Sequence, residues 1–310
     1  MRVTEGSNYE AVRENIRRSK EKMENLQIQS STLKKVNRPS DDPVAAARLL
    51  GIRTDQANNS QFQMNSRSVE NFLMNTDQAA SDLSEVVLRA KEIALGQSSV
   101  VSSSDDTRMG IAQEVLQLFQ QAVSVANRRV GDRYLFGGYK TQNPPVDPAG
   151  EYWGDDGQMM VEVGDDVFMS MNVPGNEMFN TQPRPQHSAL MAYGEPSPEN
   201  VNIFDELQKL RISLLSGDLE GIRGTLEPFD QLRSKLISTR AQVGSRLQGL
   251  QYANQANERH TISNSVLSSS LEDADMAQVV SDLNKEETIF RNALATSKKM
   301  VQPTLLDFLK

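Results

Sequence analysis

The residue types that most often carry catalysis and metal binding are scarce in this sequence. Its 310 residues include no cysteine and two histidines, His187 and His260. A disulfide framework, a zinc–thiolate site, an iron–sulfur centre and a cysteine nucleophile are therefore excluded. Neither histidine has a second one near it in the sequence, so we expect neither a histidine-rich metal site nor a histidine acid–base catalyst.

Two pairs of adjacent carboxylates, Asp155-Asp156 and Asp165-Asp166, are the remaining candidates for chemistry. A glycosidase needs two carboxylates that face each other across a cleft, one of them with a raised pKa. Both pairs lie beside glycines, a context typical of turns. The sequence also lacks the Walker, GxSxG, HExxH, GxGxxG and EF-hand patterns. We therefore expect no catalytic, cofactor-binding or metal site, and a protein that is not an enzyme.

The overall composition limits the class of partner. The chain carries 41 acidic and 33 basic side chains, which gives a formal net charge of −8. This balance argues against a general nucleic-acid binder, which needs a basic stripe. No run approaches the roughly 20 apolar residues of a membrane span, so no membrane partner is expected. Apolar residues at 37% and aromatic residues at 5% suit long helices with narrow apolar faces better than one thick core.

Residues 139–200 differ in composition from the rest of the chain. They hold eight of the twelve prolines, and ten acidic side chains against two basic ones. Such a segment cannot be helical throughout. Alternating apolar side chains predict two short strands at residues 158–163 and 167–171, with residues 164–166 as the turn. We expect Trp153, the only tryptophan, in the core of this insert rather than as a platform for a sugar.

Both ends of the chain show the heptad spacing of a coiled coil. The steps alternate between three and four residues, and six of eight positions in each stretch are apolar. The same periodicity fits two surface helices of a globular bundle equally well. The apolar positions are Tyr9, Val12, Ile16, Met23, Leu26 and Leu33 in the N-terminal seam, and Met276, Val280, Leu283, Phe290, Leu294 and Val301 in the C-terminal seam.

Helix signals fill the sequence between these ends and the insert. Asp42 is expected to cap a helix that begins at Pro43. Apolar periodicity predicts a short helix over residues 203–217 and a longer one over 222–250, with Pro228 near its start or kinking it. We therefore predict a mainly α fold with a β-rich insert (α+β). It would combine terminal coiled-coil-like helices, a rod-like helical bundle domain and a small central β domain.

Four segments resemble the flagellin superfamily. Residues 34–47, with Pro-Ser-Asp-Asp-Pro at 39–43, resemble its N-terminal segment in the form typical of the hook-associated protein 3 branch. Residues 132–141 resemble the Tyr-Leu-Phe-Gly turn of the same branch, and residues 240–247 and 271–277 resemble C-terminal segments of the superfamily. The order of the four, on both sides of a variable insert, favours this branch. The last eight residues look flagellin-like, which keeps flagellin as an alternative.

The resemblance implies a division of the chain into three parts. Residues 1–38 and 265–310 would be terminal helical segments that form the inner layer of a tubular assembly. Residues 39–138 and 201–264 would form a helical rod domain, and residues 139–200 an outward-facing β insert. The terminal segments are expected to be largely disordered in the monomer, because ordering a narrow seam without a partner costs on the order of 1 kcal/mol or more per residue.

The resemblance also implies a function: a structural subunit of the bacterial flagellum, an adaptor ring that joins hook to filament. The alternative is flagellin, the bulk filament subunit. The implied partners are copies of the chain itself in a ring or helical assembly, a neighbouring hook-associated protein and filament flagellin. The residues of both seams would form the assembly interface, and the interdomain turn would consist of Pro39, Ser40, Asp41, Asp42 and Pro43.

The implied location is the extracellular flagellum, reached through flagellar type III secretion without a cleaved signal. The polar N-terminus, which lacks an apolar signal core, agrees with that route. A cytosolic flagellar export chaperone would hold the C-terminal seam before secretion, at Leu283, Phe290, Leu294 and Val301. Two competing hypotheses from other classes are an enzyme that uses the acidic insert and a coiled-coil regulator that stays in the cytoplasm.

Overall fold

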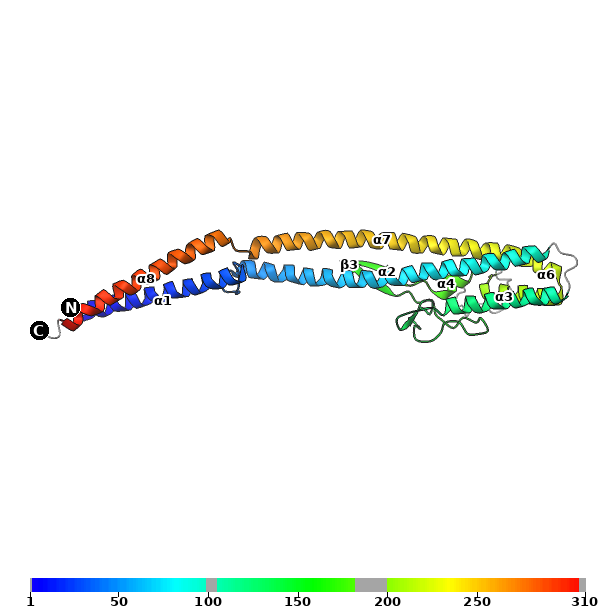
Figure 1. The fold of residues 1–310 in the computed structure, drawn as a ribbon, viewed down its shortest axis with the longest axis horizontal. Helices are drawn as coiled ribbons and strands as arrows, with labels where there is room; N and C mark the ends of the chain where they lie inside the picture. The colour runs from blue at the N-terminus through cyan, green and yellow to red at the C-terminus, as the bar shows by residue number, and fades with distance from the viewer. Residues whose placement is uncertain (1, 99–104, 182–199, 307–310) are drawn as a thin grey trace, which may run out of the picture. The chain divides into compact units, whose positions relative to one another are not determined.

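The computed structural model of this protein describes residues 2–98, 105–181 and 200–306, with side chains described for residues 10–98, 106–181 and 200–298. The chain divides into two compact units, Met1–Asn59 with Arg259–Lys310, and Ser60–Glu258. Most of the described residues are helical, and the described strands form two small hairpins. The predicted mainly α fold with a small β insert is confirmed (Figure 1).

The first unit is built around a pair of terminal helices. α1 (Arg2–Thr32) and α8 (Met276–Leu306) lie side by side in an antiparallel pair (Figure 1). The unit also contains the first part of α2 (Pro43–Ser98) and the last part of α7 (Leu226–Glu272). Oδ1 of Asp42 accepts hydrogen bonds from the amides of Val44 and Ala45 at 3.0 and 2.9 Å. The predicted cap at the start of α2 is therefore confirmed.

The second unit holds the larger hydrophobic core, which lies between the remaining parts of α2 and α7 and several shorter elements. Helix α3 packs against α5, where the rings of Phe119 and Phe204 meet edge to face with their centroids 6.1 Å apart. The shorter elements are α3 (Asp105–Ala126), β1 (Arg129–Val130), β2 (Arg133–Tyr134), β3 (Met160–Gly164), β4 (Val167–Ser170), α4 (Gly175–Phe179), α5 (Ile203–Ser216) and α6 (Leu219–Gly224).

Of the two helices predicted after the insert, the first is confirmed and the second is divided in two. The predicted helix over residues 203–217 is α5, which ends at Gly217 with a φ of 71°, a left-handed conformation that favours glycine. The single helix predicted over residues 222–250 is instead two helices, because α6 ends at Gly224 and α7 begins at Leu226. Pro228 lies in the first turn of α7, where a missing amide hydrogen is tolerated.

The predicted hairpin of the insert is present. Strands β3 and β4 pair antiparallel, and the turn between them places Asp166 at a φ of 56°. The side-chain amides of Asn65 in α2 and Asn257 in α7 donate hydrogen bonds to the carbonyls of Glu162 and Val163 at 2.8 and 2.7 Å. Two amides from separate helices therefore hold β3 in place, in addition to the apolar side chains beneath the hairpin.

The prediction for Trp153 was wrong, because its side chain is 63% exposed. The more buried aromatic residue is its neighbour Tyr152, which is half-buried and whose ring packs edge to face on Phe179 at a centroid distance of 6.0 Å. The Tyr152 hydroxyl donates to the carbonyl of Phe136 at 2.8 Å, and burial raises the pKa of this hydroxyl. Successive side chains of an extended segment point to opposite sides, so burying Tyr152 turns Trp153 outward.

The domain boundaries at residues 38/39 and 264/265 stay a prediction, and the boundaries of the two compact units lie elsewhere in the chain. They fall inside α2, after Asn59, and inside α7, after Glu258. Both points lie within continuous helices, so no proline, glycine or cap marks them in the sequence. None of the described helices carries an apolar stretch that would let it cross a membrane.

Candidate assembly interface

Polar contacts set the register of α1 against α8. The hydroxyl of Ser19 donates to Oε2 of Glu286 at 3.2 Å, and the ammonium of Lys22 lies 3.6 Å from Oε1 of the same carboxylate. Ser19 is 6% exposed and the Glu286 side chain 16%, so their hydrogen bond lies inside the helix pair, whereas the Lys22 side chain is 70% exposed at its edge. A polar pair within an apolar seam favours one axial alignment, because other alignments leave a buried polar group without a partner.

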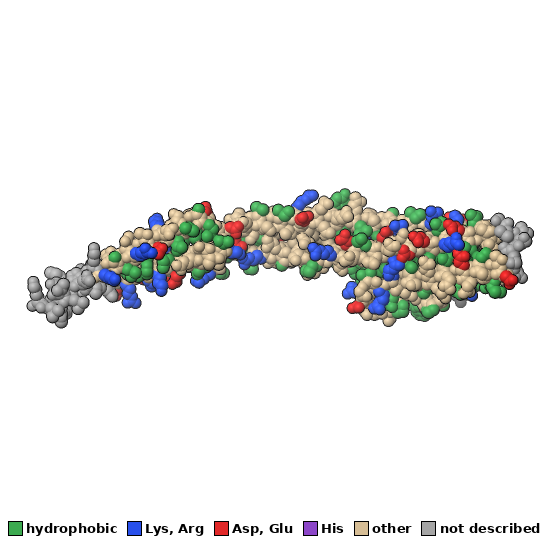
Figure 2. All heavy atoms as spheres, viewed as in Figure 1, with side chains coloured by type: hydrophobic (Ala, Val, Ile, Leu, Met, Phe, Trp, Pro, Cys, Tyr) green, Lys and Arg blue, Asp and Glu red, His purple; other side chains and the backbone are tan. Residues whose placement is uncertain are grey.

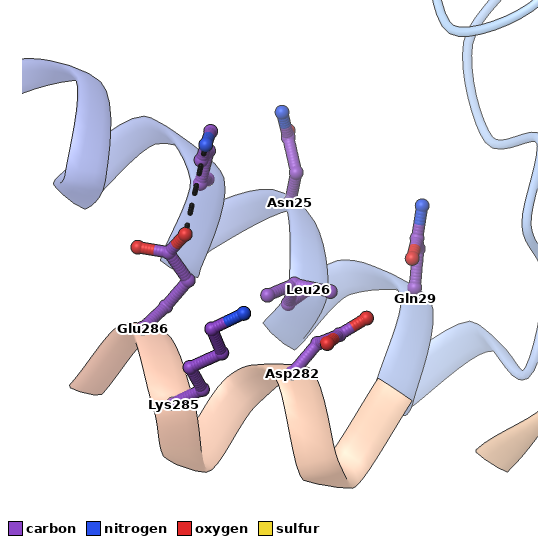
Figure 3. A pocket seen from close by; sticks show the side chains of 7 residues that line it. Asn25, Leu26, Gln29, Asp282, Lys285 and Glu286 are labelled. Atoms are coloured by element: carbon purple, nitrogen blue, oxygen red, sulfur yellow. Dashed lines mark ion pairs between the residues drawn. The ribbon is translucent and has the colours of Figure 1, made fainter. Parts of the chain in front are cut away.

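An open groove of about 380 Å³ runs along this contact. Figure 3 shows Leu26 of α1 pointing toward α8, with Asp282 and Lys285 nearby. Polar side chains surround this single apolar one, whereas small-molecule clefts are lined mainly by apolar groups. The groove therefore has the character of a helix–helix interface. Its lining residues are Lys22, Asn25, Leu26, Gln29, Asp282, Lys285 and Glu286.

Most of the predicted N-terminal seam lies on one side of α1. Its members Val12, Ile16, Met23 and Leu26 are half-buried. Leu33 differs from the prediction, because it follows the end of α1, has a φ of 61° and is 57% exposed. The left-handed backbone at this residue turns the chain out of the helix, which removes Leu33 from the seam.

The predicted C-terminal seam falls on two faces of α8. Val280 and Leu294 are 45% and 41% exposed, whereas Val279, outside the predicted seam, is 7% exposed. Neighbouring residues of a helix lie about 100° apart, so a shift of one residue moves a side chain from the buried face to its flank. The other described apolar members of the seam are half-buried: Met276, Leu283 and Phe290.

The exposed members leave an apolar strip on α8. Val280 and Leu294 are separated by two heptads and therefore lie close to one line along the helix. Figure 2 shows hydrophobic side chains among lysines and arginines along the terminal helix pair. Such a strip suits contact with another protein surface. The side chains of Tyr9 and Val301 lie outside the described residues, so their place in the seams stays a prediction.

The predicted interdomain turn is closed by its first aspartate. Oδ2 of Asp41 accepts hydrogen bonds from the amides of Asn37 and Arg38 at 3.1 and 2.8 Å. The Asp41 amide donates to the carbonyl of Arg38 at 3.0 Å. Pro39 and Ser40 are exposed between these contacts. The two aspartates of the motif thus have separate roles, because one closes the turn and the next caps α2.

Glu272, at the end of α7, is a central residue of this region that was not predicted. Its side chain is 8% exposed, and its Oε1 lies 2.6 Å from both the Lys34 ammonium and the Arg53 guanidinium. The Lys35 amide donates to the Glu272 carbonyl at 2.6 Å. We call Glu272, Lys34 and Arg53 the Glu272 clamp. Lys34 and Glu272 both lie in segments that resemble the flagellin superfamily, which is the signal that could have identified them.

Exposed ion pairs stabilise α1 along its solvent side. Arg17 and Arg18 lie 2.7 and 2.9 Å from Oε1 of Glu14. Their hydrogen bonds, with Arg17 making the larger contribution, lower the pKa of Glu14 to about 2. Pairs three and four residues apart add a few tenths of a kcal/mol each to a helix, roughly 0.2–0.5, and they weaken with salt.

Of the two acidic pairs, Asp165-Asp166 lies in a turn, as predicted, and Asp155-Asp156 lies in an irregular segment. Oδ1 of Asp155 accepts from the amides of Tyr139 and Gly157 at 2.6 and 3.0 Å, and Asp166 lies in the β3–β4 turn. Within the described residues, no three histidine, aspartate or glutamate side chains are grouped so as to hold a metal. His260 is exposed on α7, and His187 lies outside the described residues.

The sequence is similar to a known family model and to known flagellar proteins. Residues 4–141 match the model of the bacterial flagellin N-terminal helical region. The chain thus carries a flagellin-type N-terminal region. It is 25% identical over 319 residues to flagellar hook-associated protein 3 of Salmonella typhimurium, with 97% of each chain covered. The corresponding Escherichia coli protein is 25% identical over 272 residues, with 84% of each chain covered.

A flagellin is also among the relatives. The flagellin of Listeria monocytogenes is 22% identical over 282 residues, which cover 91% of this chain and 89% of the relative. The resemblance to hook-associated protein 3, first seen in four short motifs, is confirmed over nearly the whole chain.

Solved structures show the same fold. A putative flagellar hook-associated protein from Vibrio parahaemolyticus superposes with a TM-score of 0.65 at 18% identity, covering 75% of this chain and all of that one. The flagellar hook-associated protein-3 of Legionella pneumophila gives a TM-score of 0.59 at 17% identity, covering 71% of this chain and 98% of that one. The fold is therefore shared between chains whose sequences have diverged widely.

Proposed function

We propose that this chain is a structural subunit of the bacterial flagellum that forms an adaptor ring between hook and filament. The observation that carries the proposal is the similarity to flagellar hook-associated protein 3 over 97% of both chains, which includes the terminal helices. Flagellin remains the second candidate, because the Listeria relative is similar over 91% of this chain at slightly lower identity. The Pro-Ser-Asp-Asp-Pro turn favours the first candidate.

The terminal helices supply the proposed contacts between subunits. α1 and α8 cover each other's half-buried side chains, and Val280 and Leu294 remain exposed beside that seam. A neighbouring copy that covers these two residues would add a third helix to the pair. Contacts of this heterologous kind generate rings or helical tubes, depending on whether the rotation closes. Neighbouring layers of hook-associated protein and flagellin would meet the ring at its two faces.

The turn and the Glu272 clamp would set the direction in which the chain passes from α1 into α2. Asp41 and Asp42 fix the backbone of the turn, and the clamp ties it to the end of α7. In a ring under load, this connection would transmit force between the terminal pair and the rest of the subunit.

Export would precede assembly. We propose that the chain leaves the cell through the flagellar type III channel, unfolded and without a cleaved signal. A cytosolic chaperone would shield the C-terminal seam until then, at Leu283, Phe290, Leu294 and Val301. The half-buried and exposed apolar side chains of α8 support this, because an uncovered seam invites premature association.

Electron microscopy of intact flagella with gold-labelled antibody against this chain tests the proposal. Antibody against the filament flagellin serves as the control on the same specimens. We expect a single band of label where hook meets filament. Label along the whole filament would replace the junction role with that of flagellin, and absence of label from flagella would exclude both.

A further inference from the structure

A polar groove of about 780 Å³ lies in the second unit. Its walls come from the loop at residues 149–153, from α4 and from α5, and its volume falls within the range of about 300–1,000 Å³ typical of ligand clefts. The lining side chains that the inference uses are Trp153, Glu151, Asn180, Asn202, Asp205 and Gln208.

Three side-chain amides of the lining form a hydrogen-bonded chain. Asn202 donates from Nδ2 to Oδ1 of Asn180 at 2.8 Å, and Asn180 donates to Oδ1 of Asn176 at 2.7 Å. Oδ1 of Asn202 accepts from the Phe204 amide at 2.8 Å, which anchors the chain to the start of α5. Each bond fixes which end of an amide donates and which accepts. The orientations of the Asn180 and Asn202 amides in the groove lining are therefore fixed before a ligand binds.

The loop at residues 149–153, which also lines the groove, is held by contacts with α5. Gln208 of α5 donates to the carbonyl of Ala149 at 2.8 Å. Gly150 has a φ of 95°, and a Cβ there would lie 2.8 Å from Cβ of Phe204. Only glycine allows this close approach without strain. Trp153 follows on the same loop with 63% of its surface exposed, although a tryptophan side chain usually gains from burial.

We propose that this groove binds a neutral oligosaccharide. An exposed indole offers a flat apolar face for a pyranose ring, while amides and carboxylates pair with hydroxyl groups as donors and acceptors. The described residues of the lining include Glu151 and Asp205 and no lysine, arginine or histidine, so this part of the groove provides no counter-charge for a phosphate or a carboxylate ligand. The carboxylates of Glu151 and Asp205 would accept hydrogen bonds from the hydroxyl groups of such a ligand. The proposal concerns binding alone, and it goes beyond the junction role without depending on it.

The single tryptophan of the chain makes the groove directly observable. Trp153 is the only source of indole fluorescence, so a ligand that covers it changes the emission of the whole protein. The full chain would be titrated at millimolar concentrations with cellohexaose, maltohexaose and chitohexaose separately. We expect a saturable blue shift with at least one of them. Failure of all three to give a saturable change would overturn the proposal.

Two variants distinguish binding in the groove from non-specific binding to exposed aromatic side chains. Calorimetry with the oligosaccharide that binds should show affinity reduced by about tenfold in Trp153→Ala, which corresponds to about 1.4 kcal/mol. Phe168→Ala is the matched control, because Phe168 is a 58% exposed aromatic residue of the same unit that does not line the groove. It should bind as the unaltered chain does. Equal binding by both variants would overturn the proposal, and circular dichroism would verify that each is folded.

Discussion

At the scale of single residues, Glu272 is the side chain whose loss should weaken the turn region most. One oxygen of its buried carboxylate pairs with both Lys34 and Arg53. The side chains of these two residues are 44% and 57% exposed, so both cations keep access to water. Buried carboxylates are stable only when they are paired, whereas exposed cations tolerate the loss of a partner. The clamp therefore depends on the glutamate more than on either basic residue.

Replacing Glu272 with glutamine should loosen the turn without altering its shape. We expect the Lys35 amide, which donates to the Glu272 carbonyl, to exchange its hydrogen about 5–30 times faster, equivalent to about 1–2 kcal/mol. Hydrogen–deuterium exchange read by mass spectrometry or NMR measures this. Glu24→Gln is the control, because Glu24 pairs with Lys20 at the surface at 3.8 Å and its loss should change little. Equal exchange rates in the two variants would contradict the clamp.

Glu14 gives a prediction about pH. Because its pKa is lowered from 4.5 to about 2 by Arg17 and Arg18, its pairs support α1 above pH 4.5. That support is lost progressively as the pH falls from 4.5 through about 2. Carboxyl-carbon NMR should record the lowered pKa, and Arg17→Ala with Arg18→Ala should return it toward 4.5. The ion pairs of Glu14 are exposed, so molar salt should screen them and should also raise the pKa of Glu14 toward 4.5. A salt-independent pKa near 4.5 would show that these pairs do not persist in solution.

At the scale of elements, a half-buried leucine of α1 and an exposed leucine of α8 predict different effects for similar substitutions. Leu26 is half-buried in the terminal pair, so Leu26→Asp should separate α1 from α8 at a cost of about 1–3 kcal/mol. Leu294 is 41% exposed, so Leu294→Asp should change the stability of the monomer by less than about 0.5 kcal/mol. Both variants should keep the second unit folded, and neither should be incorporated into flagella.

Thermal unfolding and complementation of a strain that lacks the protein measure these two properties separately. Normal filaments on a Leu294→Asp strain would remove the exposed strip from the proposed interface. A Leu26→Asp protein with unchanged helix content would mean that the α1–α8 contact contributes little in the monomer.

Much of the element map was predictable, because local signals determine it. Asp42 and Pro43 mark the start of α2, and alternation marks the β3–β4 hairpin. The choice between Val279 and Val280 as the buried residue was not predictable, since both fit a three–four spacing and the position of the partner helix decides. Trp153 was misplaced for a similar reason, because composition does not show which of two adjacent aromatic residues points inward.

The candidate interface was predictable in outline and not in detail. Periodicity and resemblance selected the correct helices, and the structure shows that they pair with each other. The ion pairs of Glu272 join residues more than 200 positions apart, such as Lys34 at a separation of 238 and Arg53 at 219. No local pattern encodes contacts between such distant charges. The amides of the polar groove come from α4 and from the start of α5, and only the fold brings them together.

At the scale of the whole molecule, the terminal segments at residues 1–38 and 265–310 are expected to be loosely held in the free monomer. Their pair has a narrow apolar seam with Ser19 and Glu286 inside it, and helices of this kind are marginal without further packing. Brief trypsin treatment should therefore remove both ends before it cuts Ser60–Glu258, whose core is far larger. Mass spectrometry of the fragments locates the cuts. Ends as resistant as the core would show that the pair is stable before assembly.

The antiparallel pairing of α1 with α8 has a consequence for the order of events during synthesis. Ser19 and its partner Glu286 are 267 residues apart in the chain. A ribosome adds about 5–20 residues per second, so α1 emerges roughly a quarter of a minute to nearly a minute before its partner exists. During translation α1 is therefore without its partner helix for this interval. Any protein that binds the segment in that time contacts the apolar side chains that α8 later covers.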